Sequence, residues 1–91
     1  MADETRWTRD STVVFSEISD GHAALLDTDG GLYYSLNPAG ATVWQQLEEP
    51  CTVAELTTAL TTAFDVPAEV AARDVEALLA DLSQRGLVRT S

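Results

Sequence analysis

Two hydrophobic patterns divide this chain near its middle. Short, mostly apolar runs bounded by turn residues occupy residues 12–18, 22–27 and 32–36, as in β-strands. After residue 37, apolar residues recur every three or four positions, as on one face of a helix. We therefore expect an α+β domain in which a three-stranded antiparallel sheet is followed by three helices.

Short turn signals separate the three predicted strands. Asp20-Gly21 supplies two residues that accept the positive φ angles of a tight hairpin turn, and Asp29-Gly30-Gly31 marks a second turn. The strands should form a meander with residues 32–36 at its edge. The face of this strand that we expect to meet the helices consists of Leu32, Tyr34 and Leu36.

Helix-start signals follow the last strand directly. Asn37 is a good N-cap and Pro38 a good first helical residue, so a helix should begin there and end near Glu49-Pro50. Thr52 and Glu55 have the spacing of a capping box, which predicts the start of the second helix.

The third helical pattern is the longest. It starts near Pro67 and should close at Arg85-Gly86, followed by a short extended segment at residues 87–89. At 100° per residue, two flanks lie beside its apolar stripe, an acidic flank and the flank opposite to it. We expect one of these flanks to border the sheet edge. The stripe is Ala71, Val75, Leu78, Leu79 and Leu82; the flanks are Asp74, Leu78, Asp81 and Arg85, and Ala72, Glu76 and Ser83.

The length of 91 residues fits one small domain, which we place at residues 12–89 after a flexible N-terminus at residues 1–11. The sequence contains neither a long apolar run nor the basic and apolar regions of a signal peptide, so we expect a cytoplasmic protein without a membrane partner.

Charge narrows the choice of partners. Fifteen acidic residues oppose five arginines, giving a formal net charge of −10. Such a chain repels nucleic acid and favours a basic or apolar-basic partner, although acidity also serves solubility alone.

Candidate catalytic and metal-binding residues are sparse. The Asp27–Gly31 segment lacks most of the ligands of a calcium loop, His22 is the single histidine, and Cys51 is the single cysteine. Carboxylate pairs such as Glu48-Glu49 have no pattern that builds a pocket around them. We therefore expect no enzyme activity, no metal and no cofactor.

The element order is also that of a winged helix-turn-helix, whose third helix would read DNA. That helix carries four acidic residues against two arginines, which disfavours phosphate contacts. An acidic carrier protein is disfavoured because such a domain needs a serine at a helix start in the order Asp-Ser-Leu, whereas this chain has Asp81-Leu82-Ser83 within a helix.

Six short segments, taken in order, resemble the PqqD-like family of leader-peptide recognition domains, and the resemblance covers about residues 12–89. They are Tyr34-Ser35-Leu36-Asn37, Trp44, Thr52-Val53-Ala54-Glu55-Leu56, Asp74-Val75, Leu78-Leu79-Ala80-Asp81-Leu82 and Gly86-Leu87-Val88.

The resemblance implies a winged-helix-like fold that binds peptide. In this family the leader of a precursor peptide adds as a strand to the third strand and lies against the third helix. Carried onto this chain, the backbone contacts fall on Leu32, Tyr33, Tyr34 and Ser35, and the groove wall on Ala71, Asp74, Leu78, Asp81 and Arg85. We expect apolar leader residues between Tyr34 and Leu78, and leader Lys or Arg side chains at Asp74 and Asp81.

The resemblance is greatest to stand-alone members of lasso-peptide pathways. Such a protein would present the leader to a separate leader peptidase and assist the ring-forming enzyme. Delivery of the precursor of pyrroloquinoline quinone to a radical enzyme is an alternative. A third alternative is an acidic winged-helix protein that associates with DNA or pairs with itself through its exposed edge.

Overall fold

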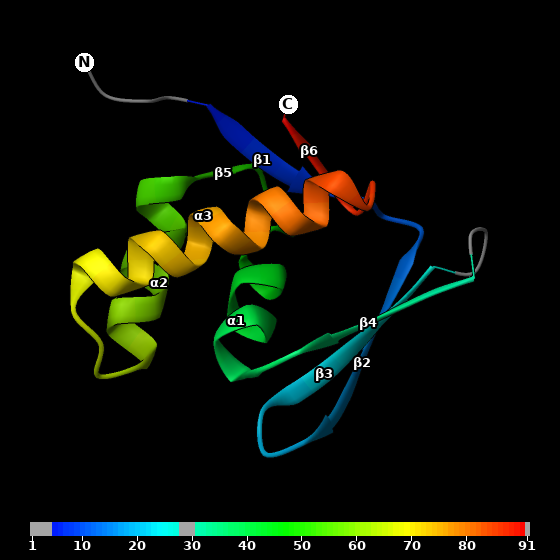
Figure 1. The fold of residues 1–91 in the computed structure, drawn as a ribbon, viewed down its shortest axis with the longest axis horizontal. Helices are drawn as coiled ribbons and strands as arrows, with labels where there is room; N and C mark the ends of the chain where they lie inside the picture. The colour runs from blue at the N-terminus through cyan, green and yellow to red at the C-terminus, as the bar shows by residue number, and fades with distance from the viewer. Residues whose placement is uncertain (1–4, 28–30, 91) are drawn as a thin grey trace.

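The protein, described by a computed structural model over residues 5–27 and 31–90, contains two small sheets and three helices (Figure 1). One sheet is the predicted antiparallel meander, in the order β2-β3-β4. Its strands are β2 (Val13–Ser19), β3 (His22–Asp27) and β4 (Leu32–Leu36). The residues between β3 and β4 that would test the calcium-loop alternative, 28–30, lie outside the described residues.

The first hairpin has the predicted geometry. Asp20 and Gly21 both have positive φ, at 53° and 83°, and they link Ser19 to its pairing partner His22. This is a two-residue type I′ turn, whose twist matches that of the strands. Cross-strand pairing then continues without a register shift from β3 to β4, from Ala23 opposite Leu36 to Asp27 opposite Leu32.

The three helices are α1 (Pro38–Gln46), α2 (Val53–Ala63) and α3 (Ala68–Gln84). Both predicted N-caps are present: the Asn37 side chain accepts from the Gly40 amide, and Thr52 and Glu55 form the complete capping box. Gly86, with φ of +76°, follows the C-terminus of α3. The α+β, winged-helix-like arrangement expected from the sequence is therefore confirmed.

A second sheet joins the two ends of the described chain. Its order is β5-β1-β6, formed by β5 (Cys51–Thr52), β1 (Arg6–Arg9) and β6 (Val88–Thr90). The flexible N-terminus predicted for residues 1–11 is thus corrected at residues 6–9, because their backbone pairs with strands on both sides. Residues 1–4 lie outside the described residues.

The core lies where α1, α2 and α3 meet the inner face of the meander. Trp44, Leu47, Leu56 and Leu82 are each at most 1% exposed. The apolar stripe predicted for the third helix lies in this core, with Leu78 only partly buried at its border. Within the described part of the chain, no helix is long and apolar enough to cross a membrane.

The outer face of the meander carries an exposed apolar row. Val14, Leu26 and Tyr33 are cross-strand neighbours on β2, β3 and β4, and their exposed fractions are 48%, 38% and 58%. This outer face is therefore less polar than the solvent-facing side usual for an antiparallel sheet that packs on one side only.

Candidate functional site

The open edge of β4 is the first feature of the candidate site. Within the described residues β4 pairs with β3 on one side and with no strand on the other, and the open side lies toward α1 and α3 (Figure 1). An unpaired strand edge presents backbone donors and acceptors that another chain can bind.

The type I′ hairpin fixes which backbone groups of β4 face outward. In a two-residue hairpin the closing pair, here Ser19 and His22, is hydrogen-bonded. Backbone groups of a strand point alternately to its two neighbours, so Ala23, Leu25 and Asp27 of β3 face β4. Their partners on β4 are Leu36, Tyr34 and Leu32. Tyr33 and Ser35 therefore direct their backbone N–H and C=O groups to the open edge.

A groove runs between β4 and the helices, and we call it the β4 groove. Its volume is about 290 Å³. Four of the predicted site residues, Tyr34, Ser35, Asp74 and Leu78, line it. Its other lining residues are Leu36, Asn37, Ala39, Gly40, Val43, Leu60, Val75 and Ala77.

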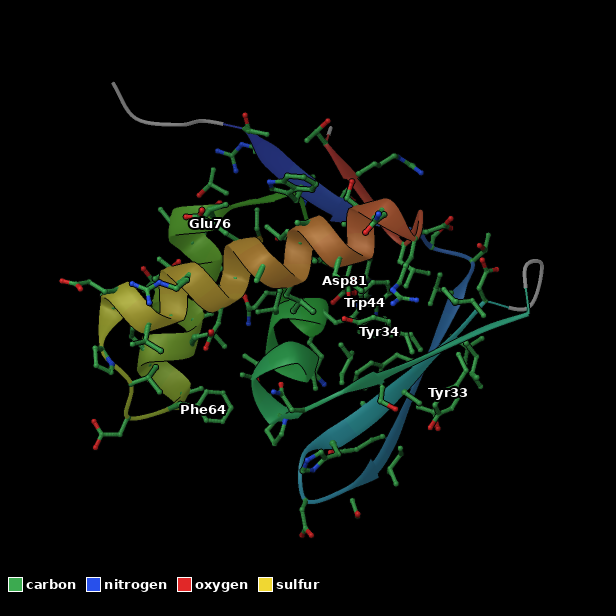
Figure 2. All side chains as sticks on the ribbon, viewed as in Figure 1. Tyr33, Tyr34, Trp44, Phe64, Glu76 and Asp81 are labelled. Carbon is green, nitrogen blue, oxygen red and sulfur yellow. The ribbon has the colours of Figure 1, made fainter. Side chains whose placement is uncertain are left out.

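Tyr34, Asp81 and Arg85 form a polar bridge from β4 to α3, which we call the Tyr34 bridge (Figure 2). The Tyr34 hydroxyl donates to Asp81 Oδ2 at 2.6 Å. Arg85 Nε donates to Asp81 Oδ1 at 3.2 Å, and the Arg85 guanidinium lies 5.1 Å from the centroid of the Tyr34 ring. The carboxylate is thus shared between two neighbours within the chain.

The Tyr34 bridge shifts the pKa of both oxygen acids. Desolvation, followed by the hydrogen bond to Asp81, raises the pKa of Tyr34 from 10.0 to about 12. The hydrogen bond from Tyr34 is the largest cause of the lowered pKa of Asp81, and Arg85 adds to it. The pair is therefore held as a neutral phenol and an ionised carboxylate across the physiological range.

Asp74 is the acid of the β4 groove that has no such neighbours. Within the described residues its carboxylate makes no hydrogen bond and no ion pair, and its side chain is exposed. It is therefore free to bind a basic group from outside the chain.

The remaining predicted residues lie outside the β4 groove, in four different environments. Leu32 is half-buried against the core, and Tyr33 is exposed on the outer face of the sheet. Ala71 is only 1% exposed and lies in the core, so it does not form part of the groove wall. Asp81 and Arg85 belong to the Tyr34 bridge and are absent from the lining of the β4 groove.

The sequence reasoning missed the α1 side of the groove. Gly40 gave the clearest signal, because a glycine two residues after Pro38 is unfavourable in a helix unless space is limited. A Cβ at Gly40 would lie 3.1 Å from Leu36 Cδ2. The glycine therefore permits close contact of α1 with the end of β4.

Other chemistry is not assembled in the described part of the chain. No group of three or more His, Cys, Asp or Glu residues could bind a metal ion there. Burial, followed by the nearby Glu55 and Glu49, raises the pKa of the Cys51 thiol, which disfavours the thiolate that a nucleophile needs.

Comparison with known proteins places this geometry in a family. The family model for coenzyme PQQ synthesis protein D (PqqD) matches residues 22–88. Curated proteins give no significant match.

Two solved structures are similar to the chain. One is TbiB1 in complex with the TbiA(beta) leader peptide, with a TM-score of 0.77 and 27% identity over 90% of this chain and 94% of that chain. The other is lasso peptide synthetase B1 complexed with the leader peptide, with a TM-score of 0.74 and 26% identity over 91% of this chain and 96% of that chain. Because the family model covers β3, β4 and all three helices, the chain belongs to the PqqD family.

Proposed function

We propose that this protein binds the leader segment of a ribosomally made precursor peptide by strand addition to β4. The observation that carries the proposal is the open β4 edge beside the β4 groove. It is supported by the two similar structures, both of which are complexes with a leader peptide. Strand addition provides affinity through main-chain hydrogen bonds, and pockets for alternate side chains provide selectivity.

The register on β4 follows from the hairpin geometry. The guest strand forms hydrogen bonds with the backbone of Tyr33 and Ser35, while Leu32 and Tyr34 keep theirs with β3. Every second guest residue then directs its side chain toward the β4 groove. The binding energy consequently depends on alternate guest amides.

The composition of the groove defines the preferred leader. Leu36, Val43, Leu60 and Leu78 favour an apolar anchor residue, and Asp74 favours a basic residue beside it. Asp81, which was also expected to pair with the leader, remains in the Tyr34 bridge. The leader therefore contacts one free carboxylate, that of Asp74, while Asp81 holds the Tyr34 side chain in place beside the groove.

The protein acts without catalysing a reaction itself. Binding raises the effective concentration of the precursor at a second protein. If the protein serves a lasso-peptide pathway, that second protein is a leader peptidase, and the ring-forming enzyme is a further partner. The alternative is delivery of a precursor in pyrroloquinoline quinone synthesis. It is supported by the match to the family model for coenzyme PQQ synthesis protein D.

The test starts with a search of the neighbouring genes for a short precursor peptide, whose labelled leader segment is then titrated with this protein in fluorescence anisotropy. We expect saturable binding, and single N-methyl groups along the segment should weaken it at every second position. Binding that is absent up to about 1 mM would refute the function. Equal sensitivity at consecutive positions would refute the register. Comparison of a lasso precursor with a quinone-cofactor precursor distinguishes the two pathways.

A further inference from the structure

A second, larger groove lies on the opposite flank of α3. It has a volume of about 1030 Å³ and is formed by α2, α3 and the start of β1. We call it the helical groove. Its apolar surface includes Trp7, Val53, Ala72 and Leu79, and its α3 rim carries Glu69 and Glu76.

The two grooves use different flanks of one helix. Glu76 and Asp81 are five residues apart on α3, which separates their directions by about 140°. Figure 2 shows Glu76 on the side of α2, while Asp81 lies on the side of Tyr34. A molecule in the helical groove therefore does not displace a strand bound to β4.

The charge of the helical groove is one-sided. Within the described residues, neither Glu69 nor Glu76 makes a hydrogen bond or an ion pair, and no basic side chain lines the groove. The nearby Arg6 is already paired with Glu55 at 3.3 Å. A ligand of this groove must therefore supply both apolar surface and positive charge.

The spacing of the two glutamates fits a helix. They are seven residues apart, so they lie two turns or about 10 Å apart along α3. Ala72 lies between them and, because its side chain is small, allows the helix of a partner to approach α3 closely. A partner helix with basic residues two turns apart beside an apolar stripe would meet the same spacing.

We propose that the helical groove binds a basic amphipathic helix of a protein partner. The protein then holds two ligands at once, a strand on β4 and a helix between α2 and α3. A second copy of this chain is a poor occupant, because each copy carries a formal net charge of −10. The inference does not depend on leader binding, since it concerns a separate surface.

The probe is a designed helical peptide of about five turns, with leucine and alanine on one face and lysine or arginine beside it. Its twin carries glutamate at the basic positions. Titration into ¹⁵N-labelled protein should give saturable amide shifts at Val53, Ala72 and Leu79 with the basic peptide only. Equal binding of the acidic twin, or shifts confined to β4, would overturn the proposal.

Two variants make the test specific. E69Q combined with E76Q should weaken binding of the basic peptide by about two- to thirtyfold, as expected for two exposed ion pairs. The control, E17Q combined with E48Q, removes the same charge from exposed sites elsewhere and should bind as the native chain does. Equal losses in the two double variants would mean non-specific attraction and refute the site.

Blocking the groove separates this inference from leader binding. A72R should abolish binding of the basic peptide while leaving binding of the leader segment to β4 intact, with circular dichroism confirming the fold. Unchanged binding of the basic peptide by A72R, or self-association of the native chain that A72R removes, would refute the proposal. If the native chain binds the basic peptide but not the leader segment, only the proposed function is refuted.

Discussion

Removing the Tyr34 hydroxyl tests the Tyr34 bridge directly. Y34F deletes the 2.6 Å bond to Asp81 and keeps the ring beneath the Arg85 guanidinium. When buried, hydrogen bonds to charged groups change a folding equilibrium constant by more than about tenfold. The Asp81 side chain is 40% exposed, so water replaces part of the lost interaction. We expect about a fivefold decrease in the folding equilibrium constant and a decrease in Tm of about 4–8 °C.

The pH dependence identifies the bond responsible. The pKa of Tyr34 is raised in the folded state from 10.0 to about 12, so its contribution is complete below pH 10.0 and is lost as the pH rises through about 12. The lowered pKa of Asp81 sets the opposite limit: its contribution is present above 3.8 and is lost as the pH falls below that value. The stability difference between the native chain and Y34F should therefore be largest between these limits.

The assays are urea denaturation across this pH range and ultraviolet titration of tyrosinate. The phenol with the raised pKa should disappear in Y34F and persist in Y33F, whose altered side chain is exposed on the outer face of the sheet. Equal stability of Y34F and the native chain from neutral to alkaline pH would refute the bridge, as would persistence of the high-pKa phenol in Y34F.

Three further results are expected. T52A removes half of the capping box and should lower the free energy of unfolding by about 1 kcal/mol in chemical denaturation. The control T58A, within α2, should not lower it. Equal effects of the two substitutions would contradict the role of the cap. D74N should weaken leader binding by up to about fivefold and reduce its salt dependence, with E17Q as the control; anisotropy unchanged in D74N would remove Asp74 from the site. Because its pKa is raised, Cys51 should react with a thiol reagent more slowly than the unfolded chain does and faster as the pH rises; equal rates in the folded and unfolded chain would exclude this shielding.

The fold was predictable because its signals are local. The hairpin turn at Asp20-Gly21, the N-cap Asn37 and the capping box at Thr52 each act within a few residues. Strand β1 had no such signal, since Arg6–Arg9 contains one apolar residue and its pairing partners lie far along the chain. Pairing of that kind depends on where the helices place β5 and β6.

The site was predictable in its elements and less so in its residues. Helical periodicity placed Asp74 and Leu78 on one flank of α3, and both line the β4 groove. Ala71 lies on the buried stripe with Val75, so its place in the core followed equally from the pattern. The contact between Tyr34 and Asp81 joins residues 47 positions apart, and no spacing rule reaches that far.

The order of elements also has a consequence for synthesis. β2, β3 and β4 are contiguous, so the open edge and the outer row of Val14, Leu26 and Tyr33 can form once residue 36 has emerged from the ribosome. The sheet of β1 and β6 closes only after Val88–Thr90 has been made. Until α3 has been synthesised, the nascent chain exposes the unpaired edge of β4 without a helix beside it. Its negative charge then opposes edge-to-edge pairing between neighbouring nascent chains, so acidity protects the edge before it has a ligand.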